Sequence, residues 1–130
     1  MNDVISGRCL CGEVRFETTN EPVLQLLCHC TDCQTISGAA AYAAYVVPIN
    51  TLKVVQGETA HFSVHADSGR INSRHFCPNC GSRVWAILEE MGMASVNGLA
   101  LDDRAHFKPA ANHMPGSAPN WCQFGDLPEA

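Results

Sequence analysis

Charged residues are scarce in this sequence, and basic residues are the scarcest of them. Charged side chains make up 16% of the chain, and 8 lysines and arginines stand against 13 acidic residues, which gives a formal net charge of −5. Proteins that bind nucleic acids normally carry clustered basic residues that neutralise the phosphate backbone. The composition therefore argues against nucleic acid as a partner.

Long apolar runs are missing as well. The longest one, residues 38–49, falls short of the roughly 20 residues that span a bilayer, and it includes tyrosine and proline. The first residues do not show the basic stretch and apolar core of a secretory signal. We therefore expect a cytoplasmic protein without a membrane partner, folded as a single domain over residues 1–130.

Cysteine, in contrast, is abundant, with eight in 130 residues. An even number could form disulfides, but a reducing cytosol disfavours them. The cysteines occur in C-x-C and C-x-x-C pairs, which are too close for relaxed bridges and suit tetrahedral thiolate ligation. The spacings therefore predict metal sites, with zinc favoured by an all-thiolate ligand set.

Two cysteine pairs, far apart in the sequence, predict a closed structural site. Cys9 and Cys11 place both sulfurs on one face of an extended segment. Cys77 and Cys80 belong to a Cys-Pro-Asn-Cys-Gly turn, in which Gly81 can adopt a positive φ. A metal held by all four thiolates would tie the N-terminal strand to this turn, so its binding energy would contribute to folding.

Three further cysteines, Cys28, Cys30 and Cys33, lie within six residues. If residues 28–30 are extended, the first two sulfurs share one side and the His29 ring points to the other. Three thiolates with an open position are typical of a catalytic zinc, because the open position admits water or substrate. The alternative is a second closed site completed by Cys122, His29, His75 or His113. The spacing alone leaves both interpretations open.

Alternating apolar residues and frequent turns predict an all-β fold with one short helix. The helix is expected at residues 31–37, with Thr31 or Asp32 as N-cap and Gly38 as its stop. Tyr42 and Tyr45 should face opposite sides of a strand, one buried and one exposed. The expected strands cover residues 13–18, 23–28, 39–47, 52–55, 61–64, 83–88 and 93–97. After residue 101 we expect an ordered wrap with little regular structure.

Three blocks of the sequence resemble the signature of the glutathione-dependent formaldehyde-activating enzyme (GFA) family, also called the centromere protein V/GFA-type domain. They read Gly-Arg-Cys-Leu-Cys-Gly-Glu-Val at 7–14, Cys-His-Cys-Thr-Asp-Cys-Gln at 28–34, and Arg-His-Phe-Cys-Pro-Asn-Cys-Gly-Ser-Arg at 74–83. The tail, with Pro109, His113 and Ser-Ala-Pro-Asn-Trp at 117–121, is similar to the end of that family's pattern.

The resemblance implies a Mss4-like β fold stapled by two Zn²⁺ per chain. It implies a structural zinc on Cys9, Cys11, Cys77 and Cys80. It also implies a catalytic zinc in an open site on Cys28, Cys30 and Cys33. The family's reaction joins formaldehyde to glutathione to give S-hydroxymethylglutathione, which is formally a carbon–sulfur lyase reaction run in reverse.

We therefore expect a zinc-dependent carbon–sulfur lyase or synthase that acts on adducts of a small thiol, such as glutathione, with a small aldehyde. Asp32 and Ser37 lie next to the catalytic cysteines in sequence and could orient substrate or transfer a proton. The alternative function is a non-catalytic two-zinc binding module that docks on a protein partner, since a fold does not fix a function.

Overall fold

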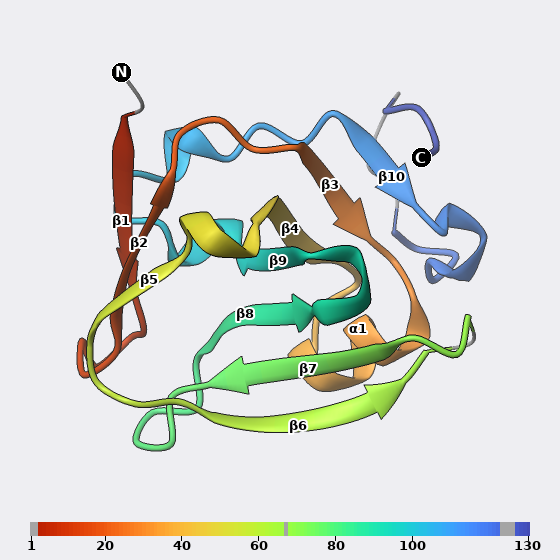
Figure 1. Cartoon of the computed structure of the whole chain (residues 1–130). Helices are drawn as coiled ribbons and strands as arrows, with labels where there is room; N and C mark the ends of the chain where they lie inside the picture. Colours follow the sequence, from red (N-terminus) through yellow and green to blue (C-terminus); the bar gives the residue numbers. More distant parts are fainter. Residues whose placement is uncertain (1–2, 67, 123–126) are drawn as a thin grey trace.

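The computed structural model describes residues 3–66, 68–122 and 127–130, whose strands form two sheets (Figure 1). The smaller sheet is antiparallel, in the order β1 (Val4–Arg8), β2 (Arg15–Thr19), β5 (Lys53–Gln56). The larger sheet has the order β10-β3-β4-β9-β8-β7-β6, and β10 is parallel to β3 while all other pairs are antiparallel. Its strands are β3 (Leu24–Cys28), β4 (Tyr42–Pro48), β6 (Ala60–His65), β7 (Ile71–Phe76), β8 (Arg83–Leu88), β9 (Met93–Asn97) and β10 (Ala111–His113).

Helical structure in the described residues consists of one α-helix and several single turns. The helix is α1 (Thr31–Ser37). The 3₁₀ turns are η1 (Ile49–Thr51), η2 (Glu89–Met91), η3 (Gly98–Ala100), η4 (Arg104–His106) and η5 (Pro115–Ser117). None of the helices described is long and apolar enough to cross a membrane. The predicted all-β fold with one short helix is confirmed.

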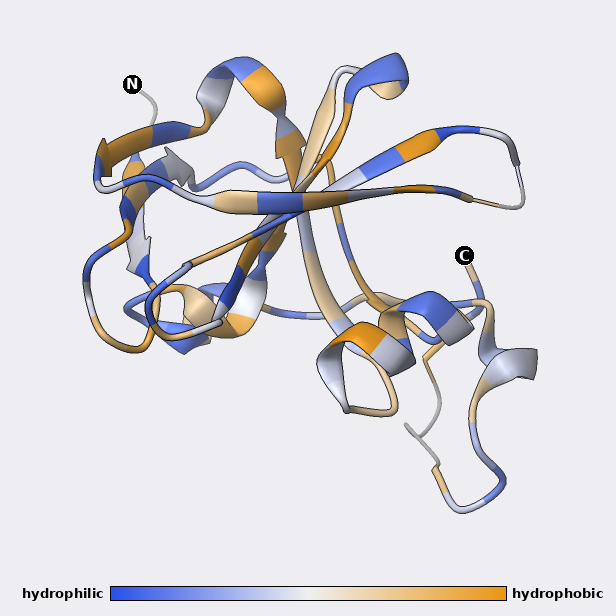
Figure 2. Ribbon diagram, turned by 90° about the horizontal axis from the view of Figure 1, so that it is seen from below, coloured by the Kyte–Doolittle hydropathy of each residue, from blue (hydrophilic) through white to orange (hydrophobic). Residues whose placement is uncertain are grey.

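The hydrophobic core lies between the two sheets. Phe16 of β2 and Trp85 of β8 meet edge to face, with ring centroids 5.6 Å apart, and Tyr45 and Val47 of β4 are buried with them. Such a ring pair adds about 0.5–1.5 kcal/mol beyond its buried area. Hydrophobic and hydrophilic residues alternate along β6 (Figure 2). Val14 and Phe16 are both buried, as predicted. This packing holds the small sheet against the large one.

The prediction that one of Tyr42 and Tyr45 is exposed is wrong. Strand β4 lies inside the larger sheet, between β3 and β9, and residues on both of its faces are buried. Tyr45 packs into the core between the sheets, while Tyr42 packs on the opposite face with Cys33 of α1. The two hydroxyls donate to the backbone oxygens of Thr19 at 2.8 Å and Ser95 at 3.2 Å. Period-two alternation placed the two rings on opposite faces correctly, but α1 covers the second face.

The tail contributes a strand that the sequence analysis did not predict. Residues of β10 pair with β3, with His113 opposite Cys28. The Asn112 backbone bonds to the backbones of Pro128 and Ala130, each at 2.7 Å, so the last residues pack beside β10. The polar, proline-rich sequence hides this strand, because its apolar alternation is only three residues long. The tail thus reaches the end of β3 where the three-cysteine segment begins.

Candidate metal centres

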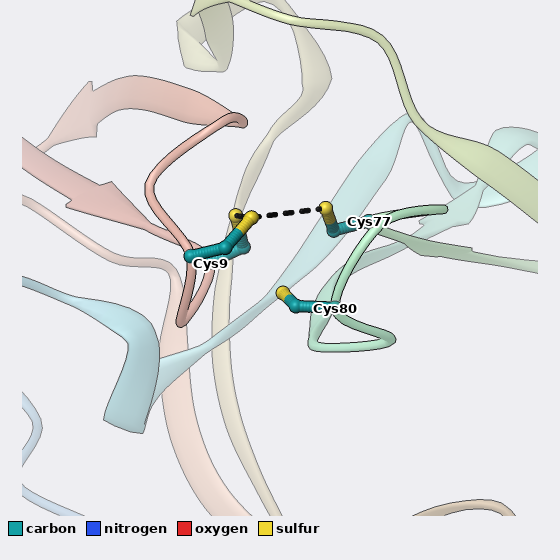
Figure 3. A group of neighbouring side chains, drawn as sticks. Cys9, Cys77 and Cys80 are labelled. Atoms are coloured by element: carbon teal, nitrogen blue, oxygen red, sulfur yellow. Dashed lines mark hydrogen bonds between the residues drawn. The ribbon is translucent and has the colours of Figure 1, made fainter.

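Four cysteines from distant parts of the chain converge at one point, which we call the four-cysteine cluster: Cys9, Cys11, Cys77 and Cys80. Their sulfurs all lie within 4.8 Å of one another, with 3.6 Å between Cys9 and Cys11 and 3.7 Å between Cys11 and Cys77. Figure 3 shows the side chains from the loop after β1 pointing toward those of the turn between β7 and β8. A tetrahedron with Zn–S bonds of about 2.3 Å separates its sulfurs by about 3.8 Å. The spacing therefore fits a single metal ion.

Hydrogen bonds hold the sulfurs of this cluster in place. The Val14 N–H donates to Cys9 Sγ at 3.3 Å. The Ser82 hydroxyl lies 3.2 Å from Cys80 Sγ and accepts from the Leu10 N–H at 2.9 Å, so it links the two loops. Its hydrogen bond is the largest cause that lowers the pKa of Cys80, to about 5. The Ser82 hydroxyl therefore favours the thiolate form of Cys80, which is the form that metal ligation needs.

The second group, which we call the three-cysteine cluster, is local in sequence. Cys28 ends β3, Cys30 follows in extended conformation, and Cys33 lies in the first turn of α1. The three sulfurs also lie within 4.8 Å of one another, with 3.3 Å between Cys28 and Cys33. Among the described residues, which include Cys122 and all six histidines, no fourth ligand joins this group. The group therefore offers three thiolates to a metal.

The helix α1 covers the predicted residues, but its N-cap differs from the prediction. Its N-cap is Cys30 and not Thr31 or Asp32, and Cys30 Sγ accepts the N–H of Cys33 at 3.2 Å. The reason is that Cys30 is the last residue with extended ψ, so its side chain is the one that can reach the free N–H groups of the first turn. Gly38 ends the helix at φ 70°, as predicted. One sulfur is thus both a helix cap and a candidate ligand.

Neither Asp32 nor Ser37 is directed into the three-cysteine cluster by a hydrogen bond in the described residues. Asp32 is exposed in the first turn of α1. The Ser37 hydroxyl donates to the Cys33 carbonyl at 2.6 Å and accepts from the Ala39 N–H at 3.2 Å. Their roles in orienting substrate or transferring a proton stay predictions.

No histidine contributes a ring nitrogen to either cluster among the described residues. His29 is buried, and its Nε2 lies 2.9 Å from Asn112 Oδ1, in keeping with a packing residue whose ring points away from the sulfurs. His75 is stacked between His61 and Trp85, with ring centroids 5.0 and 5.8 Å away. Burial, followed by the nearby His61, lowers the pKa of His75.

Two arginines that the sequence analysis did not select lie beside the three-cysteine cluster. Arg74 of β7 is only 4% exposed and lies within hydrogen-bonding reach of Cys33. Arg83 of β8 lies over the Tyr42 ring, with its guanidinium carbon 5.9 Å from the ring centroid. Hydrogen bonds from Cys28 and Cys33, with the Arg74 charge as a further cause, lower the pKa of Cys30 to about 2. In the sequence both arginines flank the Cys77–Cys80 turn, so they look like neighbours of the other cluster.

Gln34 is a further residue whose role only the structure reveals. Its Nε2 donates to the backbone oxygens of His29 at 2.7 Å and Ser117 at 2.8 Å. The His29 N–H in turn donates to the His113 carbonyl at 2.9 Å. These bonds fix the three-cysteine segment against the tail, and no local pattern could have predicted partners more than eighty residues away.

Comparison with known proteins agrees with the geometry. A solved crystal structure of a protein from Rhodobacter sphaeroides shares the fold, with a TM-score of 0.59 and 21% identity over 97% of this chain and 100% of that chain. No curated protein matches the chain. The model of the family described as glutathione-dependent formaldehyde-activating enzyme matches residues 4–116, which contain all seven clustered cysteines. On this match the chain belongs to the GFA family, as its sequence motifs predicted.

Proposed function

We propose that this chain is, over residues 1–130, a single zinc-dependent catalytic domain, a carbon–sulfur lyase or synthase that acts on adducts of a small thiol with a small aldehyde. The observation that carries the proposal is the contrast between the clusters. One offers four thiolates and the other offers three, with no fourth protein ligand among the described residues. Glutathione and formaldehyde are the thiol and aldehyde that the family description suggests.

The residues fit zinc at both places. In the four-cysteine cluster the sulfur spacings of 3.6 and 3.7 Å are close to those of a tetrahedral zinc site, so this cluster would hold a structural ion. Cys28, Cys30 and Cys33 would hold the catalytic ion. A metal bound there lowers the pKa of a thiol and polarises a carbonyl oxygen.

The proposed reaction forms one C–S bond and adds one proton to the carbonyl oxygen. The thiolate sulfur of the thiol attacks the aldehyde carbon and a C–S bond forms. The π electrons of the carbonyl move to its oxygen, which takes up one proton and becomes the hydroxyl of the hydroxymethyl thioether. The reverse reaction breaks the same C–S bond. The chain's contribution is to hold the two reactants together, since well-oriented reactants gain up to several orders of magnitude in rate.

Exchange NMR tests this proposal, because it measures how fast formaldehyde and glutathione interconvert with S-hydroxymethylglutathione at equilibrium. We expect the zinc-loaded protein to accelerate the exchange. Cys30→Ala should abolish the acceleration while the far-UV circular dichroism stays native, because Cys30 is a ligand only in the three-cysteine cluster. The matched control is Cys122→Ala, which makes the same replacement outside both clusters.

Two results would contradict the proposal. The first is unfolding of Cys30→Ala, which would make the three-cysteine cluster structural. The second is a wild-type protein with both zinc ions bound that leaves the exchange rate unchanged for glutathione and other small thiols. That result would favour the non-catalytic binding module instead.

A further inference from the structure

Two cations, the buried Arg74 and the half-buried Arg83, lie beside the three-cysteine cluster without an acidic partner. Arg74 is 4% exposed, and Arg83 has its Nε and Nη1 atoms buried with no hydrogen-bond acceptor. Among the described residues, no carboxylate lies within salt-bridge distance of either guanidinium. Buried charges are normally paired, because an unpaired one loses its hydration without compensation. These two arginines therefore need a negative charge close by.

The strand register places the Arg74 side of the larger sheet toward the cysteines. Arg74 is paired with Ala86, Ala86 with Ser95, and Ser95 with Val46. Val46 packs in the same buried cluster as Cys33. Because the two residues between Arg74 and Val46 are small, the long Arg74 side chain has room to extend toward α1.

Tyr42 places Arg83 beside the same cluster. The ring of Tyr42 packs with Cys33, and its strand position is directly opposite Cys28. The Arg83 guanidinium lies over this ring at 5.9 Å, a distance at which a cation is attracted by the aromatic face. Burial raises the pKa of Tyr42, so the ring stays neutral and the negative charges near the guanidiniums are those of the cysteines.

The charges do not balance until one more anion is present. Three thiolates and one divalent metal ion sum to −1, and two arginines bring the sum to +1. We infer that Arg74 and Arg83 make the open position of the three-cysteine cluster selective for a singly negative ligand, the thiolate of the thiol substrate, over neutral ligands. The inference rests on the proposed function, because it concerns the open position and the thiol that would enter it. Without the arginines, a thiolate would approach a site that is already negative.

Ligand titration of the Co²⁺-loaded protein tests this inference without measuring turnover. The two probes are 2-mercaptoethanol, whose thiolate carries its only charge, and imidazole, which is neutral. Sulfur-to-cobalt absorption and the cobalt d–d bands report binding of each. Arg83→Gln should weaken the apparent affinity for 2-mercaptoethanol by about tenfold or more at one fixed pH, because a unit charge at short range is lost. The affinity for imidazole should not fall, and Arg83→Lys should retain most of the thiol affinity.

The matched control is Arg104→Gln, which removes an exposed arginine and should leave both affinities unchanged. An Arg83→Gln protein that binds both probes as tightly as the wild type, or loses both equally, would overturn the inference and leave the proposed function standing. A wild-type protein that binds no thiol would overturn both. Thiol binding that depends on Arg83, without accelerated exchange between formaldehyde and glutathione, would support the inference and contradict the proposed function.

Discussion

The two cysteine clusters use the same ligand type in opposite ways. The four-cysteine cluster joins segments 66 residues apart, from Cys11 to Cys77, and the Val14 N–H and the Ser82 hydroxyl bond to two of its sulfurs. The three-cysteine cluster takes all three of its ligands from one segment of six residues. Its long-range neighbours are two arginines and a tyrosine. The first arrangement is suited to closing a loop, and the second to presenting three ligands beside positively charged side chains.

This difference predicts different consequences when a ligand is removed. The largest effect is expected for Cys77→Ser, which breaks the link between the N-terminal loop and the β7–β8 turn. Structural zinc contributes about 10–16 kcal/mol to folding in small zinc domains, as much as the whole stability of a typical domain. We expect this variant to be unfolded by circular dichroism. The control is Cys122→Ser, which should stay folded; a folded Cys77→Ser protein would contradict the account.

Removal of the metals by a chelator should occur in two steps. The ion held by three protein ligands should leave first without a change in secondary structure. The second ion should leave together with unfolding, because its ligands come from both ends of a long loop. Zinc release followed with a colorimetric indicator, alongside circular dichroism, measures both steps. Simultaneous loss of both ions with unfolding would show that the clusters are not independent.

Replacing Cys30 separates its two roles. Cys30→Ala removes a metal ligand and the N-cap of α1, whereas Cys30→Ser removes the ligand but keeps a side chain that caps well. Both variants should bind one zinc instead of two. With no metal bound at the three-cysteine cluster, the free energy of unfolding of the alanine variant should be about 1 kcal/mol lower than that of the serine variant, measured by urea unfolding. Equal stabilities would mean that the Cys30 cap contributes nothing.

The smallest effect is expected from Ser82→Ala in the four-cysteine cluster. The Ser82 hydroxyl is the largest cause that lowers the pKa of Cys80, so its loss should raise that pKa. Protons then compete with the metal at higher pH, and the midpoint of acid-induced zinc release should move upward by less than about one pH unit. A midpoint of zinc release that moves to lower pH would contradict this prediction.

Local sequence patterns predicted the features of this structure that depend on neighbouring residues, namely single helices, single strands and short motifs. The boundaries of α1, β8 and β9 agree with the prediction. The family was also predicted, since its motifs are short and contain the cysteines themselves.

What the sequence analysis missed depends on distant contacts. Tyr42 is buried because α1 folds over β4, and β10 forms because β3 offers it a free edge. In the sequence, Arg74 and Arg83 stand on either side of the Cys77–Cys80 turn of the four-cysteine cluster. In the folded sheet they lie beside the three-cysteine cluster. No pattern within ten residues contains that information.

The most direct test of the difference between the clusters is zinc-edge X-ray absorption of the two-zinc protein, with and without glutathione. The account predicts about 3.5 sulfurs per zinc on average without the thiol, the mean of four and three, and about four with it. An average of about four sulfurs, or of sulfur and nitrogen together, that glutathione does not change would contradict the account, because both sites would then be closed by the protein.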